Sequence, residues 1–267
     1  MSMNFQIVRY NFINQKVKKP LRIVMIADLH NQVYGVENID LLSAIDAQQP
    51  DMILLPGDMI VCRKSEQKNN RITADTIRKM TEIAPVYYSY GNHERGLLEC
   101  VRETEGIWEQ YNKYLEGMHD LHMLVNTHEV LEPWNVCIYG LDLPREYYKR
   151  IIKKPLREAA LVSLIGRMQP ERCNLLLAHN PDYFRAYCAL HPDLIVSGHN
   201  HGGMVRIPGF GGVVSPRLHP FPKYDYGVYD SGDLCTKMVV TSGCGMHSIH
   251  IRINNPPEMV VIHVNKM

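Results

Sequence analysis

Carboxylate, carboxamide and imidazole side chains follow five apolar segments of the chain, at the point where each segment ends. They are Asp28, His30, Asp58, Asn92, His93, His179, His199 and His201. Each alone has an ordinary explanation, because an Asp or Asn after a strand commonly forms a turn or caps a helix. Ligands of open α/β sheets bind at the carboxyl ends of strands. Five coincidences at one such edge are improbable, so we interpret these residues as one polar site.

The sequence "GHNHGG" at residues 198–203 is the densest part of this pattern. It follows an apolar run at residues 193–197, but it is too rich in glycine to continue as a regular strand. Glycine accepts backbone angles that are closed to other residues and admits the close approach of a ligand. We therefore expect a tight turn whose two imidazoles could converge on one point.

The elements that must position these residues are short buried strands alternating with helices. The apolar runs that predict strands are residues 21–27, 51–56, 85–90, 135–141, 173–179 and 193–198. Near-continuous apolar runs of this length suit sheets that are covered on both faces. Residues 36–49, 71–84 and 155–168 have the apolar spacing of helices. After His201 only loops and strands are expected, at residues 227–230, 237–243 and 258–264.

This alternation predicts an α/β fold of stacked layers with a mixed sheet. The chain has no internal repeat, low-complexity tract or evident linker, so residues 1–267 are interpreted as a single domain.

Composition excludes several classes of protein. With 29 basic and 28 acidic residues the formal charge is +1, so no global field would recruit nucleic acid. Seven cysteines without a C-x-x-C pair argue against a disulfide framework and a zinc ribbon. They indicate reduced core residues of a cytoplasmic protein.

The start of the chain has no apolar core of a signal peptide, and no apolar run approaches the ~20 residues of a membrane span. We expect a soluble protein without stable membrane insertion. Its oligomeric state is not predicted.

Five short motifs in order resemble the metallophosphoesterases of the calcineurin-like superfamily. They are D-x-H (Asp28, His30), G-D (Gly57, Asp58), G-N-H-E (residues 91–94), a lone His179 and G-H-x-H (residues 198–201). Residues 198–209, 224–229 and 241–264 also resemble the YaeI/YkuE-type branch, so the resemblance covers almost the whole chain. It implies a four-layer αββα sandwich of two mixed β-sheets flanked by helices.

The resemblance also implies a site for two divalent metal ions, with Asp58 as the bridge between them. Asp28, His30 and His201 would join Asp58 on one ion, and Asn92, His179 and His199 would join it on the other. Carboxylate and imidazole donors suit Mn, Fe, Zn or Co, of which Mn is favoured, and the absence of thiolates argues against structural zinc. Two ions about 3.5–4 Å apart can clamp both oxygens of an in-line phosphoryl displacement.

The activity implied is hydrolysis of a small phosphate ester, monoester or diester, by a hydroxide held on the metals. His93 is not a ligand in the family pattern and would assist the leaving group. Arg95 could hold the substrate phosphate, because a guanidinium fits phosphate oxygens. A solvated charge at the start of the next helix is the other interpretation of Arg95.

Two alternative functions remain: a catalytically idle scaffold that binds a protein partner, and a hydrolase of lipid-linked pyrophosphates. The complete ligand set and the presence of His93 favour an active phosphoesterase over the scaffold.

The chain departs from the family pattern at a few positions. Glu94, Asn200 and Met204 stand where Asp, Thr and Gln are common, but none of these is a ligand position. His247 and His250 fall where the branch has smaller residues or proline, so their roles are not predicted.

Two segments near the site have open interpretations. The basic residues 145–158, "REYYKRIIKKPLRE", could meet anionic lipid headgroups or a polyanionic substrate, but we favour a solvated helix face broken by Pro155. The Pro/Gly-rich residues 207–227 could form a lid or substrate wall, or a simple surface excursion.

Overall fold

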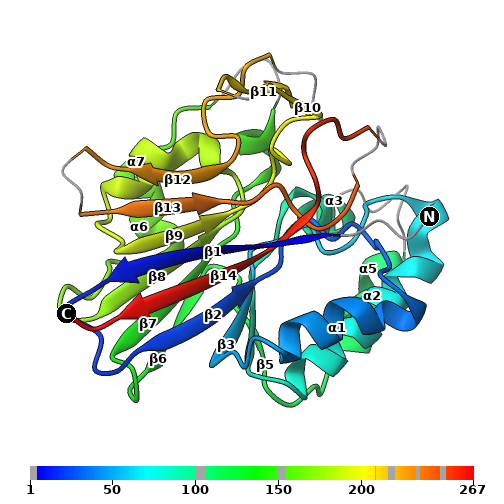
Figure 1. Ribbon diagram of the computed structural model, residues 1–267, viewed down its shortest axis with the longest axis horizontal. Coiled ribbons are helices and arrows are strands. Elements are labelled where there is room, and N and C mark those ends of the chain that lie inside the picture. The colour runs from blue at the N-terminus through cyan, green and yellow to red at the C-terminus, as the bar shows by residue number, and fades with distance from the viewer. Residues whose placement is uncertain are drawn as a thin grey trace.

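Two six-stranded sheets lie face to face in the computed structural model, with helices on both outer sides (Figure 1). The structure describes residues 5–99, 106–149, 154–207, 209–215, 220–232, 235–246 and 251–267. The predicted α/β class and the four-layer αββα sandwich are confirmed.

The first sheet has the order β1-β14-β2-β3-β4-β5. Its strands are β1 (Gln6–Ile13), β14 (Glu258–Asn265), β2 (Leu21–Met25), β3 (Met52–Leu55), β4 (Val86–Tyr88) and β5 (Leu121–Met123). Neighbours are parallel except β14 and β2, which run antiparallel. The carboxyl ends of β2, β3 and β4 therefore meet at one edge.

The second sheet has the order β12-β13-β9-β8-β7-β6. Its strands are β12 (Gly227–Asp230), β13 (Lys237–Val240), β9 (Leu194–Ser197), β8 (Cys173–Ala178), β7 (Val136–Leu141) and β6 (Thr127–Leu131). β13, β9, β8 and β7 are parallel, and the two outer strands are antiparallel to their neighbours. A separate hairpin, β10 (Val205–Ile207) and β11 (Gly211–Val214), follows β9.

Helices cover the outer face of each sheet. Over the first sheet lie α1 (Ile39–Asp46), α2 (Gln67–Thr81) and α5 (Ile107–Leu115); over the second lie α6 (Glu158–Ile165) and α7 (Phe184–Cys188) (Figure 1). α3 (Asn92–Glu99) follows β4 directly. Short 3-10 turns are η1 (Val36–Asn38), η2 (Lys64–Glu66), η3 (Arg145–Tyr148) and η4 (Pro181–Tyr183).

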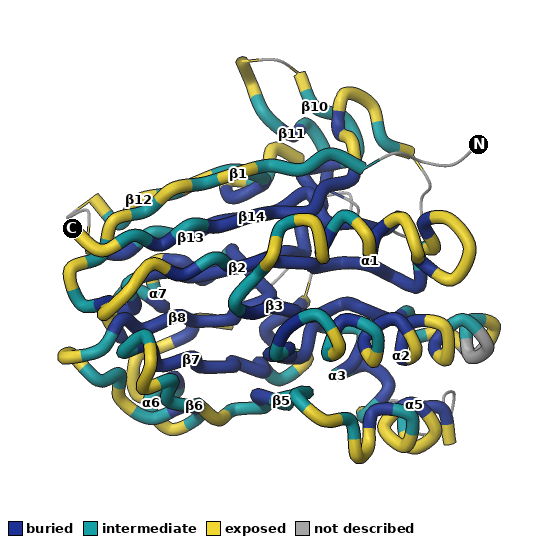
Figure 2. The backbone as a smooth tube through the Cα atoms, turned by 60° about the horizontal axis from the view of Figure 1, so that its bottom comes forward, coloured by how far each residue is buried: buried dark blue, intermediate teal, exposed yellow. Residues whose placement is uncertain are grey.

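The buried apolar residues form three clusters, one at each interface between layers (Figure 2). Successive side chains of a strand point to opposite faces. Along β8, Leu177 therefore packs between the two sheets, whereas Leu176 packs toward α6 and α7. Burial on both faces explains why the predicted strands are apolar at nearly every position.

Some predicted elements need correction. Residues 36–49 form η1 and the shorter α1, and of residues 155–168 only 158–165 are helical. Residues 145–158 do not form the one helix face that was expected, because the stretch begins with the 3-10 turn η3 and α6 begins only at Glu158, but the charged residues Arg145, Lys149, Lys154, Arg157 and Glu158 are exposed as expected. Residues 150–153 lie outside the described part.

The described helices include none that is long and apolar enough to cross a membrane. The six described cysteines are free thiols, and Cys100 lies outside the described residues. The cytoplasmic location stays a prediction.

Alanine substitutions on the two faces of β8 test this layering. Leu176→Ala and Leu177→Ala should each lower the free energy of unfolding by about 2–5 kcal/mol, because each leaves a cavity in a closed core. Urea titrations measure both, with the exposed Ile13→Ala as control. If either substitution left the free energy of unfolding unchanged, that face of β8 would be exposed to water.

Candidate metal centre

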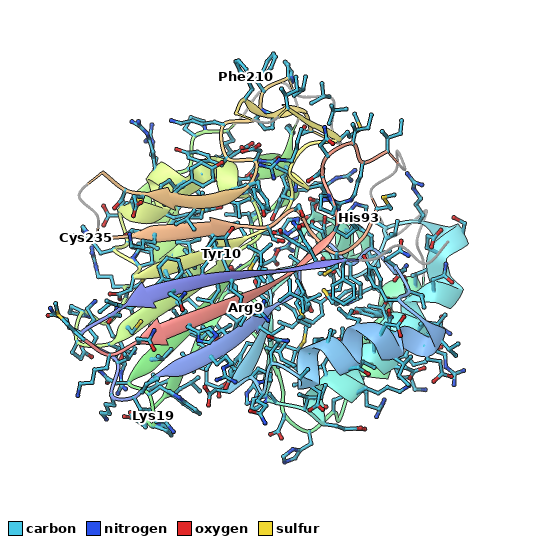
Figure 3. All side chains as sticks on the ribbon, viewed as in Figure 1. Arg9, Tyr10, Lys19, His93, Phe210 and Cys235 are labelled. Atoms are coloured by element: carbon cyan, nitrogen blue, oxygen red, sulfur yellow. The ribbon has the colours of Figure 1, made fainter. Side chains whose placement is uncertain are left out.

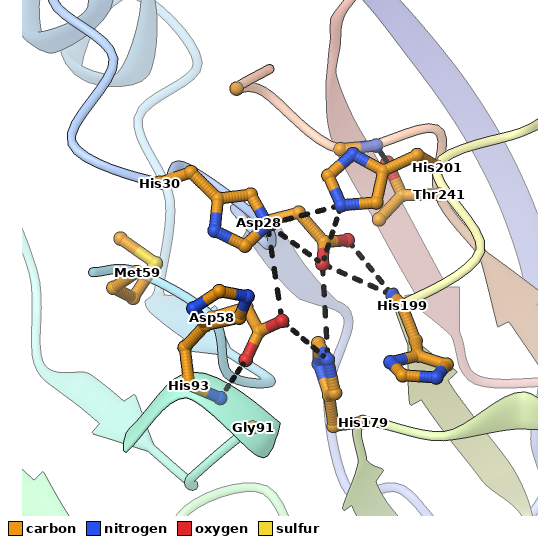
Figure 4. Close-up of polar contacts among 12 residues, drawn as sticks. Asp28, His30, Asp58, Met59, Gly91, His93, His179, His199, His201 and Thr241 are labelled. Atoms are coloured by element: carbon orange, nitrogen blue, oxygen red, sulfur yellow. Dashed lines mark hydrogen bonds and ion pairs between the residues drawn. The ribbon is translucent and has the colours of Figure 1, made fainter. Parts of the chain in front are cut away.

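The ends of β2, β3 and β4 from one sheet and of β8 and β9 from the other bring the predicted site residues to one edge of the sandwich (Figure 4). Asp28 and Asp58 are 0% and 2% exposed, and His179, His199 and His201 are also buried. Charged groups are seldom buried without a compensating partner. A positively charged ligand would therefore stabilise the two buried carboxylates.

Asp28, His30 and His201 form the first group of donors. His30 Nε2 lies 3.0 Å from His201 Nε2. Asp28 Oδ1 lies 3.4 Å from His201 Nε2 and 3.9 Å from His30 Nε2. These are three of the four residues that the family resemblance assigns to one metal.

Asp58, His179 and His199 form the second group, whose ligand atoms lie within 4.8 Å of one another. His179 Nδ1–H donates to the Pro56 carbonyl over 2.9 Å, which leaves His179 Nε2 without a proton in the neutral ring. That Nε2 is buried without a hydrogen bond and lies 3.1 Å from Asp58 Oδ2. A histidine held in this way presents a lone pair to a metal.

Asn92 is the remaining predicted ligand, and it begins α3. Its side-chain Oδ1 is buried and finds no hydrogen-bond partner among the described residues. An orphaned buried carbonyl oxygen is costly unless a ligand satisfies it. Asn92 Oδ1 and His179 Nε2 are thus two buried atoms with free lone pairs, of kinds that divalent cations bind.

Asp58 faces both donor groups. Its Oδ2 lies 3.1 Å from His179 Nε2 in the second group and 3.9 Å from His30 Nε2 in the first. Its other oxygen, Oδ1, accepts the His93 backbone N–H at 2.8 Å. This arrangement supports a bridging carboxylate.

His93 differs from the other histidines in its hydrogen bonding. Its Nδ1 accepts the backbone N–H of Cys62 over 2.9 Å, so the neutral ring carries its proton on Nε2. Its ring lies 4.7 Å from that of His30, edge to face. One potential ligand atom each of His93, His30 and Asp58 also lie within 4.8 Å of one another. A proton on Nε2 suits a donor to substrate better than a metal ligand.

Burial and mutual charge set the protonation of the cluster. Burial and the negative charge of Asp58 raise the pKa of Asp28 to about 7, although His179 opposes the shift. Burial also raises the pKa of Asp58, but His179 and His93 more than offset this and hold it well below its usual range. For His179, burial lowers the pKa, but Asp58 and Asp28 together raise it to about 9. The cluster therefore binds protons where a divalent cation could replace them.

Glu94 connects two of the loops, a role that the sequence did not reveal. Its fully buried carboxylate accepts the backbone N–H groups of Asp58 at 2.9 Å, Met59 at 2.8 Å and Gly91 at 2.9 Å. It also accepts the Tyr88 hydroxyl at 2.7 Å. The bond from Gly91 is half of a capping box at the start of α3, and Glu three residues after the cap was the available signal.

Arg252 is a second supporting residue that sequence analysis missed. Its Nη2 donates to the carbonyls of Ser242 at 2.7 Å and Gly245 at 2.6 Å, and lies 3.4 Å from His201 Nδ1. Gly245 in turn donates its N–H to the Asp28 carbonyl at 2.6 Å. Arg252 thus braces the loop behind Asp28.

The glycines of the motifs make room more than they make turns. A Cβ on Gly198 would meet Asp28 Oδ2 at 2.2 Å, and one on Gly91 would meet Asp58 Oδ1 at 2.3 Å. Neither has a left-handed backbone, whereas Gly202 does, at φ +67°. The expected tight turn runs through the whole "GHNHGG" sequence, because the Asn200 N–H donates to the Gly198 carbonyl and the Gly203 N–H to the Asn200 carbonyl, while Gly198 leaves room for the carboxylate.

Arg95 points its guanidinium at Asp142, which follows β7. The two side chains form a two-pronged pair at 3.1 Å and 2.5 Å. Burial raises the pKa of Asp142 to about 6, although Arg95 opposes the shift. A contact between Arg95 and substrate phosphate stays a prediction. His247 and His250 lie outside the described residues.

A cavity of about 710 Å³ opens beside the centre, and Asn92 and His93 form part of its wall. It extends to the turn η3. The segment at residues 207–227, expected as a lid or wall, contributes the hairpin β10–β11, whose tip carries the exposed Phe210 (Figure 3). Residues 208 and 216–219 lie outside the description.

The family model described as calcineurin-like phosphoesterase matches residues 21–203. An uncharacterized metallophosphoesterase of Campylobacter jejuni, Cj0846, is 26% identical, over 93% of this chain and 60% of that protein. YkuE of Bacillus subtilis, an uncharacterized metallophosphoesterase, is 25% identical over 90% of this chain and 77% of its own. The phosphodiesterase YaeI of Escherichia coli is 25% identical over 97% and 88%. The chain thus spans about 60% of the length of the Campylobacter relative.

Glu94→Gln tests the brace between the loops. The amide nitrogen cannot accept from the backbone N–H groups that face it, so the free energy of unfolding should fall by about 1–3 kcal/mol and metal binding should weaken. Chemical denaturation and elemental analysis measure the two effects. The exposed Glu99→Gln on the same helix should change neither. Full metal content in Glu94→Gln would contradict the bracing role.

Asp58→Asn tests the bridge. If Asp58 serves both donor groups, the variant should bind fewer ions at both positions, and elemental analysis after loading and desalting should show less than the wild-type content. Asp193→Asn, at the opposite end of β9, is the matched control. Two tightly held ions in Asp58→Asn would rule out bridging.

Proposed function

Because the chain belongs to the calcineurin-like phosphoesterase family, we propose that this centre hydrolyses phosphate esters of small molecules with two divalent metal ions. The observation that carries the proposal is the pair of donor groups with Asp58 between them and the protonated Nε2 of His93 beside them. The similarity to YaeI and YkuE agrees with the branch expected from the sequence.

Each donor group would hold one ion. Asp28, His30 and His201 would bind the first, and His179, His199 and Asn92 the second, with Asp58 shared. When bound, such ions lower the pKa of the attacking water and neutralise charge on the phosphoryl oxygens. The mixture of carboxylate and imidazole donors suits manganese, which we propose as the working metal.

His93 would act on the leaving group. As the water oxygen bonds to phosphorus, the bond from phosphorus to the leaving oxygen breaks, the proton on His93 Nε2 passes to that oxygen, and the proton that the attacking water loses restores the neutral imidazole. The Cys62 N–H keeps Nδ1 as an acceptor, so the transferable proton stays on Nε2. The hydrogen bond from the His93 backbone N–H to Asp58 holds His93 beside the carboxylate that would bridge the ions.

A scaffold that has lost catalysis would be expected to lack part of this machinery. The described residues instead bring Asp28, His30, Asp58, His179, His199 and His201 together with His93 in three overlapping donor groups, and Asn92 Oδ1 is a buried oxygen without a hydrogen-bond partner. We therefore propose an active hydrolase. Whether this hydrolase prefers a phosphodiester or a phosphomonoester would depend on which substrate group fills the neighbouring cavity.

His93→Ala should keep near-normal metal content and lose roughly 10²–10⁴ in kcat, the usual contribution of a general acid. The loss should be smaller for p-nitrophenyl esters, whose leaving group needs little protonation, and larger for alkyl esters. Elemental analysis and steady-state kinetics with Mn-loaded protein measure both, with the remote His128→Ala as control. Loss of a metal from His93→Ala would make His93 a ligand. Equal losses across leaving groups would indicate charge stabilisation instead of proton donation.

A further inference from the structure

Arg95 and Asp142 form an ion pair that connects the two sheets beside the metal centre. Arg95 lies on α3, which follows β4 of the first sheet, whereas Asp142 follows β7 of the second. Arg95 Nε donates to Asp142 Oδ1 over 3.1 Å, and Arg95 Nη2 lies 2.5 Å from Oδ2. The Asp142 side chain is 1% exposed and that of Arg95 is 22% exposed. A two-pronged pair of this kind fixes the direction of α3 as well as its distance from β7.

Asp142 is a fixed point for this pair, because its own backbone is held on both sides. Its N–H donates to Asn126 Oδ1 over 2.9 Å, and Asn126 Nδ2 donates to its carbonyl over 3.0 Å. Asn126 lies in the connection from β5 of the first sheet to β6 of the second. The guanidinium of Arg95 therefore binds a carboxylate whose position is set independently of α3.

The spacing along α3 relates Arg95 to the predicted ligand Asn92. Arg95 is three residues after Asn92, which begins the helix. Side chains three residues apart lie on one face of a helix, so the face of α3 that meets Asp142 also carries Asn92. Asn92 Oδ1 is buried, and no hydrogen bond from the described residues holds it. Its position therefore depends on how α3 is set against the second sheet.

The donors proposed for the second ion come from both sheets. Asn92 follows β4 of the first sheet, whereas His179 follows β8 and His199 follows β9 of the second. His179 is tied across the sandwich, because its Nδ1–H donates over 2.9 Å to the carbonyl of Pro56, which follows β3. The pair on α3 supplies a second tie, on the side of Asn92. The separation of the amide oxygen from the two imidazoles therefore depends on that pair.

The first donor group has a tie of its own between the sheets. The His199 N–H donates to both oxygens of Asp28, at 3.1 Å and 3.0 Å, which joins the loop after β9 to the loop after β2. These bonds do not involve α3. Loss of the pair between Arg95 and Asp142 would therefore leave Asp28 in place and displace Asn92.

The surroundings of Arg95 fit a positioning role better than a contact with substrate. The described residues that line the cavity beside the centre include Asn92, His93 and Gly96 of α3 but not Arg95. Two nitrogens of Arg95 face Asp142, and its Nε also lies 3.7 Å from Glu99 Oε1. Two carboxylates thus already balance its charge.

We propose that the pair of Arg95 and Asp142 positions Asn92, so that binding of the second metal ion depends on this pair. The inference rests on the proposed two-metal function. It makes Arg95 and Asp142 positioning residues, which act through Asn92 without touching the substrate. It also gives Arg95 a different role from the contact with substrate phosphate that its residue type suggests.

Arg95→Ala and Asp142→Asn test the pair. Each should weaken binding of one manganese ion by roughly 10–100-fold, the usual cost of removing a residue that orients a metal ligand, and should leave the other ion bound. Equilibrium dialysis with elemental analysis measures the two affinities, and electron paramagnetic resonance should show a single ion in place of a coupled pair. Glu99→Gln removes the other carboxylate near Arg95 and is the matched control, which should keep both ions.

Milder and combined variants separate positioning from a general effect on folding. Arg95→Lys keeps the charge without the two-pronged geometry and should show a smaller loss of the same ion. Arg95→Ala/Asp142→Asn should lose no more affinity than the more affected single variant, because the two residues act as one unit. Equal weakening of both ions in these variants would make the pair a general support of the fold and would overturn the proposal.

Kinetics separate positioning from contact with substrate. With bis-p-nitrophenyl phosphate, Arg95→Ala should lower kcat at limiting manganese, and saturating manganese should restore kcat with KM unchanged. A raised KM with both ions retained would instead make Arg95 a contact of the substrate phosphate, which also overturns the proposal.

The same measurements separate this inference from the proposed function. If the wild-type protein binds two manganese ions but cleaves no phosphate ester, the proposed hydrolysis fails, while selective loss of one ion from Arg95→Ala would still support the role of the pair. If the wild-type protein cleaves bis-p-nitrophenyl phosphate and Arg95→Ala keeps both ions at wild-type affinity, the inference fails alone. A wild-type protein that binds only one ion would overturn both.

Discussion

Two carboxylates buried side by side with four imidazole rings are the constraint on which this structure depends. In a low-dielectric interior, Asp28 and Asp58 repel each other and are costly to ionise without a nearby positive charge. Backbone N–H groups supply part of the compensation: His199 donates to both oxygens of Asp28 at 3.1 Å and 3.0 Å, and His93 donates to Asp58. These uncharged amides supply only part of the compensation, because burial still raises the pKa of Asp28 to about 7, so a proton or a cation must supply the rest.

The backbone of the site is held in conformations that a free chain avoids. Asp28 (φ 51°), Asp58 (φ 54°) and His199 (φ 72°) are all left-handed, as are His30 and His201. Such residues persist only where the surrounding structure over-determines them. The strands before them are buried on both faces, and Glu94 and Arg252 fix the loops that follow. The packed layers therefore offset strain that is concentrated at one edge.

The strands and the site residues could be predicted from sequence because both depend on local order. An apolar run followed at once by Asp, Asn or His needs no knowledge of distant contacts, since parallel strands end at one edge. The partners of Glu94 and Arg252 could not be predicted, because those side chains bind backbone groups brought close only by folding. β1 was missed for a related reason: it pairs with β14 from the opposite end of the chain, and its partly exposed residues, with Ile13 open to water, lack the apolar continuity of a buried strand.

Hydrogen bonds with backbone groups give two histidines of the site opposite tautomers. The Pro56 carbonyl accepts a hydrogen bond from His179 Nδ1–H, which leaves the lone pair on Nε2 of the neutral ring. The Cys62 N–H donates to His93 Nδ1, which leaves the proton of that ring on Nε2. Two rings of the same chemistry thus suit opposite tasks, metal binding and proton donation. Cys62 also lines the cavity beside the centre, together with Asn92 and His93. A group bound there would rest against the segment that fixes the proton donor, so substrate fit and protonation would depend on one stretch of backbone.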